Sequence, residues 1–196
     1  MERTDTLRTL LEDYPASTER ELRQQHRMLD LLTHDDAPFS RSSLSPGHFT
    51  ASSFVVDPQG ERLLLILHRT LGLWLQPGGH FEASDDSFEA AARREVVEET
   101  GSNNLKKLGA WPGLFDIDIH TIPENPARGE SEHEHFDLRI AFMASSDRLE
   151  ARSEVLEARW VAFDKVAELG SDESVLRCVQ RLSQHKQSFS GLRKLI

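Results

Sequence analysis

The stretch from Gly78 to Gly101, GGHFEASDDSFEAAARREVVEETG, is the most informative part of this sequence. A double glycine is followed by a segment of helical character that carries Glu95, Glu98 and Glu99. On a helix the spacings i, i+3 and i+4 share one face, so these three carboxylates are expected to point the same way. Like charges on one patch repel each other, so we expect a positive group to lie against it.

The predicted helix covers residues 86–100, and its ends carry residues that helix termini favour. Asp86 is the predicted N-cap, and Glu89 follows three residues later, as in a capping box. Gly101 stands where a helix commonly ends with a glycine.

Carboxylates grouped in this way offer hard oxygen ligands, which suit Mg²⁺ or Mn²⁺. Such an ion would neutralise the cluster and would lower the pKa of a bound water. Gly78 and Gly79 would let the backbone approach a metal or a phosphate closely. The alternative is a charged, solvated helix face. Small or apolar residues among the carboxylates favour a partly buried site over that alternative: Ala91, Ala92, Val96 and Val97.

The composition restricts the class of protein. The 196 residues include 23 Lys and Arg against 33 Asp and Glu, and the net charge of −10 argues against nucleic-acid or membrane binding through a basic face. The single cysteine, Cys178, excludes a disulfide within the chain and predicts a reducing, cytoplasmic location. The first residues lack the apolar run of a signal peptide, and the most apolar stretch, RLLLILHR, is too short to span a bilayer.

Two segments of the chain differ in character, and we place a domain boundary between them. Residues 1–45 are predicted to form a helical N-terminal extension, with leucines at helical spacing on both sides of Pro15 and a helix start near Ser17. In residues 46–196 short strand-like runs are mixed with helices. This order predicts an α/β sandwich around a mixed β-sheet.

Individual elements can be assigned from local patterns. A hairpin is expected where the turn PQGE joins FTASSFVVD to RLLLILHR. Further strand-like runs are LGLWLQPGGHF, DLRIAFMA and ARWVAF, whereas LKKLGAWPGLFDIDIHTI is predicted to form one or two strands interrupted by WPG. PENPARGESEHEHF is predicted to be a polar loop, and DKVAEL and DESVLRCVQRLSQH to be helices.

The glycine-rich turn and the helix after it together resemble the signature of the Nudix hydrolase family. That signature has a glycine, a glutamate six residues later, an Arg-Glu pair eight beyond, then Glu-Glu and a closing glycine. Arg94 and Glu95, followed by Glu98, Glu99 and a glycine, match its second half. The resemblance extends over roughly residues 48–186 and implies the Nudix αβα sandwich around a mixed sheet.

The first half of the signature departs by one residue. Gly79 and Arg94 are fifteen positions apart, one more than in the family, so the place of the early glutamate falls on Asp85 or Asp86. We interpret the difference as a one-residue insertion in the loop before the helix. The role of the first acid therefore stays open.

The resemblance implies an enzyme, a Nudix-type pyrophosphohydrolase dependent on Mg²⁺ or Mn²⁺. Its substrate would contain a diphosphate linkage in a nucleoside diphosphate joined to another moiety, of the nucleotide sugar, ADP-ribose or nucleoside triphosphate type. The implied metal ligands are the carbonyl of Gly78 and the carboxylates of Glu95, Glu98 and Glu99. Glu95, Glu98 and Arg94 are the implied catalytic residues, with Arg94 in reach of a salt bridge to Glu98, and either acid could accept the proton. Many relatives dimerise, so a homodimer is possible.

Residues next to the motif could contact substrate. Gly79 and His80 lie at the predicted phosphate loop and are candidate substrate-binding residues. Trp74, Trp111 and Trp160 could stack on a base, but large aromatic side chains are more often buried in a core.

A second polar constellation lies downstream, in SEHEHFD. If this segment is a strand, alternation puts His133, His135 and Asp137 on one face. We favour a polar loop over a zinc site there, because no cysteine supports zinc. An acid from this segment could instead supply a further ligand or base, and Glu134 and Asp137 are our candidates for contact with substrate.

Two rival functions remain open from the sequence. An isopentenyl diphosphate isomerase-like enzyme would use a cysteine near the active site, and Cys178 is far from the motif along the chain. A non-catalytic nucleotide-binding sensor with the same fold would be expected to lose motif glutamates. Glu95, Glu98 and Glu99 are all present, but the shifted first acid keeps this rival open.

Overall fold

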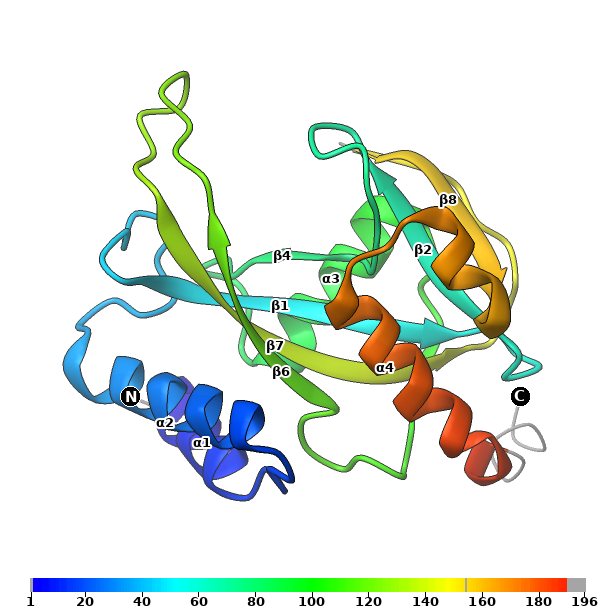
Figure 1. Cartoon of the computed structure of the whole chain (residues 1–196), viewed down its shortest axis with the longest axis horizontal. Coiled ribbons are helices and arrows are strands. Elements are labelled where there is room, and N and C mark those ends of the chain that lie inside the picture. The colour runs from blue at the N-terminus through cyan, green and yellow to red at the C-terminus, as the bar shows by residue number, and fades with distance from the viewer. Residues whose placement is uncertain (1, 154, 190–196) are drawn as a thin grey trace.

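A computed structural model of the chain describes residues 2–153 and 155–189. Among these residues, eight strands form one mixed sheet, with a helix against each face (Figure 1). The predicted α/β sandwich is therefore confirmed. None of the helices in this part of the chain has both the length and the apolar character that crossing a bilayer requires.

The elements alternate between helices and short strands along the chain. Their order and bounds are α1 (Glu2–Glu12), α2 (Glu19–His34), β1 (Gly47–Val56), β2 (Arg62–His68), β3 (Trp74–Leu75), β4 (Gly78–His80), α3 (Phe88–Thr100), β5 (Leu105–Lys107), β6 (Asp116–Ile122), β7 (His133–Ala144), β8 (Val155–Ala162), η1 (Phe163–Leu169), α4 (Glu173–Gln184) and η2 (Lys186–Phe189).

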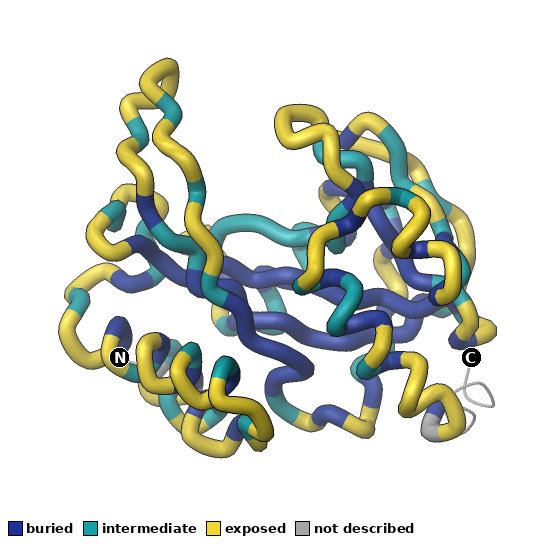
Figure 2. The backbone as a smooth tube through the Cα atoms, viewed as in Figure 1, coloured by how far each residue is buried: buried dark blue, intermediate teal, exposed yellow. Residues whose placement is uncertain are grey.

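Strand β1 organises the sheet. It pairs antiparallel with β2 across the predicted PQGE turn, where Val56 lies opposite Leu63, so the expected hairpin is confirmed. It also pairs antiparallel with β4 and, along its whole length, parallel with β7. Strand β6 pairs antiparallel with β7, and the loop between them stands away from the sheet and is exposed (Figures 1 and 2). The segment predicted as one or two strands forms two, β5 and β6.

Two boundary predictions were wrong. Helix α3 is capped by Ser87, whose hydroxyl accepts a hydrogen bond from the Ala90 amide at 3.1 Å, and not by Asp86. Asp86 is exposed, whereas Asp85 before it is buried and bonded to Arg94, as described below. Strand β7 begins at His133, so the end of the segment predicted as a polar loop is strand instead. Strand β7 pairs with β1, each paired residue lying opposite one that is 87 positions earlier in the chain, and local composition does not reveal that partner.

The sheet separates two hydrophobic cores. Along β7, Phe136 and its alternate neighbours face α3, whereas Ala141 and Met143 face α4. All ten residues of β1 are buried, as Figure 2 shows for the central strands. Trp74 and Trp111 lie in the α4-side core, as expected for large aromatics. Trp160 is half-buried, and its indole N–H donates to the Asp147 carbonyl at 2.8 Å.

The N-terminal helices pack on the same side of the sheet as α3. Leu7, Leu11 and Met28 belong to the core that also contains Val96 of α3. Arg3 of α1 donates a hydrogen bond to the backbone carbonyl of Asp85. The extension therefore supports the loop that leads into α3.

Glu21 ties the extension to α4. Its carboxylate accepts hydrogen bonds from the Ser17 amide at 2.8 Å and from the Tyr14 hydroxyl at 3.1 Å, and Arg181 of α4 also contacts Tyr14 at 3.1 Å. Burial alone would raise the pKa of Glu21, but these hydrogen bonds and the charge of Arg181 lower it to about 2. A buried, ionised acid thus holds α2 and α4 in a fixed relation.

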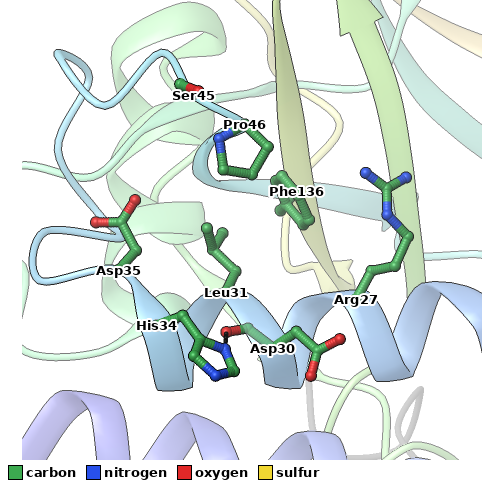
Figure 3. A pocket seen from close by; sticks show the side chains of 8 residues that line it. All are labelled: Arg27, Asp30, Leu31, His34, Asp35, Ser45, Pro46 and Phe136. Atoms are coloured by element: carbon green, nitrogen blue, oxygen red, sulfur yellow. Dashed lines mark hydrogen bonds between the residues drawn. The ribbon is translucent and has the colours of Figure 1, made fainter.

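The packing between α2 and the start of β1 is incomplete. A cavity of about 280 Å³ lies there, between Arg27, Asp30 and His34 of α2 and the pair Pro46 and Phe136 (Figure 3). None of its lining residues comes from α3, so this cavity lies apart from the glutamate face.

Candidate active site

The double glycine lies directly against the glutamate face of α3. The amide of Gly78 donates to Glu99 Oε2 at 3.0 Å. A Cβ atom added at Gly79 would be 2.4 Å from Glu95 Oε1, and one added at Gly78 would be 2.4 Å from the Cβ of Ser52. A side chain at Gly78 would collide with β1, including its backbone, and one at Gly79 would displace the Glu95 carboxylate, so the two glycines permit this close contact of β4 with β1 and α3.

Arg94 connects the carboxylates to the preceding loop. Its Nη1 donates to Glu95 at 2.9 Å and to Glu98 at 3.1 Å, so the expected contact with Glu98 is present. Its Nη2 donates to the carbonyl of His80 at 2.8 Å and to Asp85 Oδ2 at 2.9 Å, and its Nε donates to Asp85 Oδ1 at 3.1 Å. One guanidinium thereby fixes two acids of the helix and the loop before it.

The structure distinguishes the two candidates for the first acid. Asp85 is buried, forms the two-pronged ion pair with Arg94, and also accepts from the Glu82 amide at 2.8 Å. Burial alone would raise the pKa of Asp85, but the hydrogen bonds from Arg94 and Glu82 lower it. Asp86 is exposed. The extra residue of this chain therefore lies between Asp85 and the helix, not before Asp85.

This assignment predicts different effects for two neighbouring substitutions. Asp85→Asn should lower the free energy of unfolding by about 1–3 kcal/mol, because a charged hydrogen-bond partner of Arg94 is lost. Asp86→Asn should change it by no more than about 0.5 kcal/mol, as for other exposed positions. Urea unfolding monitored by circular dichroism would measure both. Equal losses in the two variants would contradict the assignment of Asp85.

The glutamate face carries excess negative charge. Asp85, Glu95 and Glu98 all form ion pairs with the single guanidinium of Arg94, and Glu99 lies beside them and accepts the Gly78 amide. Burial raises the pKa of Glu95, and the hydrogen bond from Arg94 offsets only part of this. Glu98 is the most open of the three motif glutamates, with 47% of its side chain exposed. Oxygen donors with uncompensated charge fit a hard divalent cation such as Mg²⁺ or Mn²⁺.

The two downstream acids singled out in the sequence are already engaged. Asp137 is buried on the α4 face, where it accepts from Ser52 at 2.7 Å and from Arg139 at 2.8 Å. Glu134 points to the other face of β7, because side chains alternate along a strand, and it forms an ion pair with Arg27 of α2. Asp137 and Glu134 therefore lie on opposite faces of β7 and do not form one site.

A buried ion network next to Asp137 was missed in the sequence. Arg139 is 1% exposed and contacts Asp137, Asp116 and Asp118 through its three nitrogens. Arg177 of α4 contacts Asp116 at 2.9 Å, so the network joins β6, β7 and α4. The sequence did contain a signal for this network. Charged residues alternate with apolar ones in DID of β6 and in DLR of β7, which predicts a row of charged side chains on one face of each strand.

Five histidines form a cluster on the α4 face of the sheet, next to the network of Arg139 and its aspartates. Its members come from β1, β4, β6 and β7, and neighbouring ring centroids are 4.9–5.6 Å apart. They are His48, His80, His120, His133 and His135. The sequence indicated His80, His133 and His135 but not His48 or His120. Burial lowers the pKa of His80 to about 4 and that of His135 to about 2, so these imidazoles are neutral at pH 7.

Comparison with known proteins identifies the family. The NUDIX domain model matches residues 46–182. A curated relative, "Probable DHNTP pyrophosphohydrolase" of Lactococcus lactis subsp. cremoris, is 32% identical over 99 residues, which cover 50% of this chain and 56% of the relative. The chain thus spans about half the length of that relative.

Solved structures show the same fold. A NUDIX-family hydrolase from Clostridium perfringens is 24% identical with a TM-score of 0.51, and the match covers 70% of this chain and 97% of that one. The NUDIX domain of Shewanella oneidensis NrtR, solved in complex with ADP-ribose, is 17% identical with a TM-score of 0.51, covering 80% and 96%. Because the family model matches well over half of the sequence, the chain belongs to the NUDIX family.

Proposed function

We propose that this protein is a metal-dependent Nudix pyrophosphohydrolase that cleaves a diphosphate linkage in a nucleoside diphosphate joined to another group. One observation carries the proposal. Glu95, Glu98 and Glu99 share one face of α3, and two of them lie directly against the backbone of Gly78 and Gly79. This is an acidic, oxygen-rich surface beside a backbone that no side chain shields.

The donor set fits Mg²⁺ or Mn²⁺. The carboxylates of Glu95, Glu98 and Glu99 and the carbonyl of Gly78 are the ligands that we assign to it. When bound, such an ion polarises a phosphoryl oxygen and lowers the pKa of water. The excess negative charge of the face is the structural reason to expect a cation there.

The residues of the chain contribute positioning and proton transfer. Arg94 holds Glu95 and Glu98 and anchors the loop through Asp85, so the acids are ordered before substrate arrives. Glu95 or Glu98 accepts the proton of the attacking water, since Nη1 of Arg94 holds both carboxylates beside the proposed metal ligands. The water attacks phosphorus in line, and the product phosphate leaves with the bridging oxygen.

The substrate class is supported by relatives and by neighbouring residues. The Lactococcus relative is named for a triphosphate substrate, and the Shewanella domain was solved with ADP-ribose. We therefore propose triphosphate-type and ADP-ribose-type compounds as the first two classes. Gly79 and His80 are the proposed contacts beside the carboxylates. Contact with Asp137 or Glu134 would compete with their ion pairs to Arg139 and Arg27.

The single cysteine argues against the isomerase reading. Cys178 lies on the buried side of α4, and burial raises the pKa of its thiol well above the usual value. A neutral, enclosed thiol is a poor nucleophile or proton donor for a substrate. The same single, buried thiol supports the proposed cytoplasmic location, and a homodimer remains an expectation from the family.

A hydrolysis screen tests the proposed function. The purified chain would be incubated with ADP-ribose, nucleotide sugars, nucleoside triphosphates and a pterin triphosphate, each with Mg²⁺, with Mn²⁺ and with chelator. We expect metal-dependent release of a phosphomonoester product from at least one class. Tight nucleotide binding without turnover on any compound would instead favour a nucleotide-binding sensor.

A further inference from the structure

Three of the clustered histidines are brought together by the pairing of β1 with β7. His48 lies directly opposite His135 in the parallel register, and His133 precedes His135 by two positions on the same face. One ring nitrogen from each of the three lies within 4.8 Å of those of the other two. The set is well enclosed, since His48 is 0% and His133 is 5% exposed.

Backbone carbonyls fix the proton position on two of these rings. His48 Nδ1 lies 2.9 Å from the Ser43 carbonyl, and His133 Nδ1 lies 2.8 Å from the Ser131 carbonyl. A carbonyl oxygen only accepts, so each Nδ1 carries the proton and each Nε2 presents a lone pair. An Nδ1–H bonded to a carbonyl is the outer contact that orients metal-binding histidines in proteins.

The lone pair of His48 has no partner. Its Nε2 is buried and lacks a hydrogen bond among the described residues. Leaving such a group unsatisfied costs about 1–3 kcal/mol, so a packed sheet is not expected to retain it without compensation. Three other imidazoles surround the His48 ring, with centroids 4.9–5.2 Å away.

We propose that His48, His133 and His135 form a binding site for a divalent transition-metal ion, and that this ion is Zn²⁺. Three imidazoles suit Zn²⁺ and leave a fourth position for water. Zn–N bonds of about 2.0–2.1 Å place tetrahedral ligand atoms some 3.3–3.4 Å apart. Since the three nitrogens lie within 4.8 Å of one another, binding requires each pair to approach by at most about 1.5 Å.

This site is separate from the carboxylates of α3 in ligand chemistry and in location. It has nitrogen donors on the α4 face of the sheet, whereas the motif glutamates extend from the helix on the other face. His80 connects the two, because its ring contacts His48 and His135 while its carbonyl accepts from Arg94. Zn²⁺ would thus hold β1 and β7 together beside the glycine strand. The proposal does not depend on the proposed hydrolysis.

Metal titration of the full chain tests the proposal directly. The purified protein would be stripped with chelator, titrated with Co²⁺ and then with Zn²⁺, and followed by the visible absorption of bound Co²⁺ and by thermal unfolding. With Mg²⁺ present in excess to occupy the proposed site on the glutamate face, we expect one equivalent to bind and to raise the unfolding temperature. Binding should persist in a large excess of Mg²⁺, because Mg²⁺ prefers oxygen ligands.

Matched variants identify the ligands. His133→Gln and His135→Gln should each weaken Zn²⁺ binding by at least about 10–100-fold, which is the loss seen when even an outer contact of a metal site is removed. His26→Gln, at an exposed position of α2, and Glu99→Gln, in the motif, should bind Zn²⁺ like the unmodified chain. His135 is only half-buried, so its variant is expected to fold, and circular dichroism would verify this.

Three results would overturn the proposal. The first is the absence of stoichiometric binding by the stripped protein. The second is binding that survives both histidine substitutions. The third is binding that Mg²⁺ displaces or that Glu99→Gln abolishes, since the ion would then occupy the glutamate face.

Discussion

Replacing Glu99 with glutamine should lower kcat/KM for the metal-dependent hydrolysis by about 10²–10⁴-fold, corresponding to several kcal/mol of transition-state stabilisation. Glu99 is 8% exposed, and its Oε2 accepts the Gly78 amide at 3.0 Å. Glutamine has the same shape and keeps an oxygen that can accept this hydrogen bond. The substitution therefore removes a charge from the proposed metal site with little change in packing.

The metal dependence of the rate shows whether the lost charge is responsible. In Glu99→Gln the concentration of Mg²⁺ or Mn²⁺ at half-maximal rate should rise, because one anionic ligand has become neutral. Steady-state rates measured over a metal titration would give this concentration for both proteins. Urea unfolding without metal should give free energies of unfolding within about 1 kcal/mol of each other.

Glu89→Gln is the matched control on the same helix. Glu89 is paired with Arg93 at 2.8 Å and with Lys107 at 3.2 Å, outside the glutamate face. Its substitution should leave kcat/KM and the metal requirement unchanged. Equal activity losses in the Glu89 and Glu99 variants, or a Glu99 variant with the original rate and metal requirement, would refute the assignment of Glu99 as a metal ligand.

The glutamate face was predictable because it depends on local spacing. Helical periodicity alone puts Glu95, Glu98 and Glu99 together, and the i, i+4 rule gives the contact of Arg94 with Glu98. The turn chemistry of PQGE likewise predicted the β1–β2 hairpin. Features set by neighbours within about one helical turn or one tight turn need no knowledge of the fold.

The choice between Asp85 and Asp86 was beyond the sequence. Both satisfy the motif, depending on whether positions are counted from the glycine or from the arginine. The path of the loop decides, and Arg3 of α1 contributes by holding the Asp85 carbonyl. A residue more than eighty positions away thus helps to set which acid meets Arg94, and no motif spacing contains that contact.

The aspartate–arginine cluster was missed, and the histidine cluster was predicted only in part, for a related reason. Each depends on the register of β1, β6 and β7, which puts His48 beside His135 and Asp118 beside Asp137. The single strands did carry a signal. Polar residues alternate in all three: His48, Thr50 and Ser52; Asp116, Asp118 and His120; His133, His135, Asp137 and Arg139. Three strands with polar stripes indicate one polar sheet face, although pairing partners remain unknown without the structure.

Replacing Arg139 with methionine should lower the free energy of unfolding by about 3–5 kcal/mol, the usual loss when one partner of a buried ion pair is removed. Arg139 is 1% exposed and contacts Asp137 at 2.8 Å and Asp116 at 3.2 Å. Methionine fills much of the volume but leaves these buried carboxylates with less positive charge. Urea unfolding at pH 7 would measure the change, and Arg23→Met, at an exposed i, i+4 pair with Glu19, should cost no more than about 1 kcal/mol.

The loss in Arg139→Met should depend on pH in a defined direction. Burial alone would raise the pKa of Asp118, but His120, Arg139 and Arg177 lower it below the usual 3.8. A group with a depressed pKa contributes stability above its unfolded value and loses it as the pH falls. The difference between the two proteins should therefore be complete at pH 6 and should shrink as the pH falls through about 4. A loss that is the same at every pH would assign it to packing and not to charge.

A second substitution separates the charge of Asp137 from the rest of the network. Asp137→Asn in the Arg139→Met background removes the carboxylate that lies closest to the lost guanidinium. If an uncompensated buried charge causes the destabilisation, the double variant should be more stable than Arg139→Met, and the two substitutions should couple by about 0.5–3 kcal/mol. Additive losses would instead mean that Arg177 and the hydroxyls of Thr50 and Ser52 already compensate these acids, so that Arg139 mainly fills space between β7 and α4.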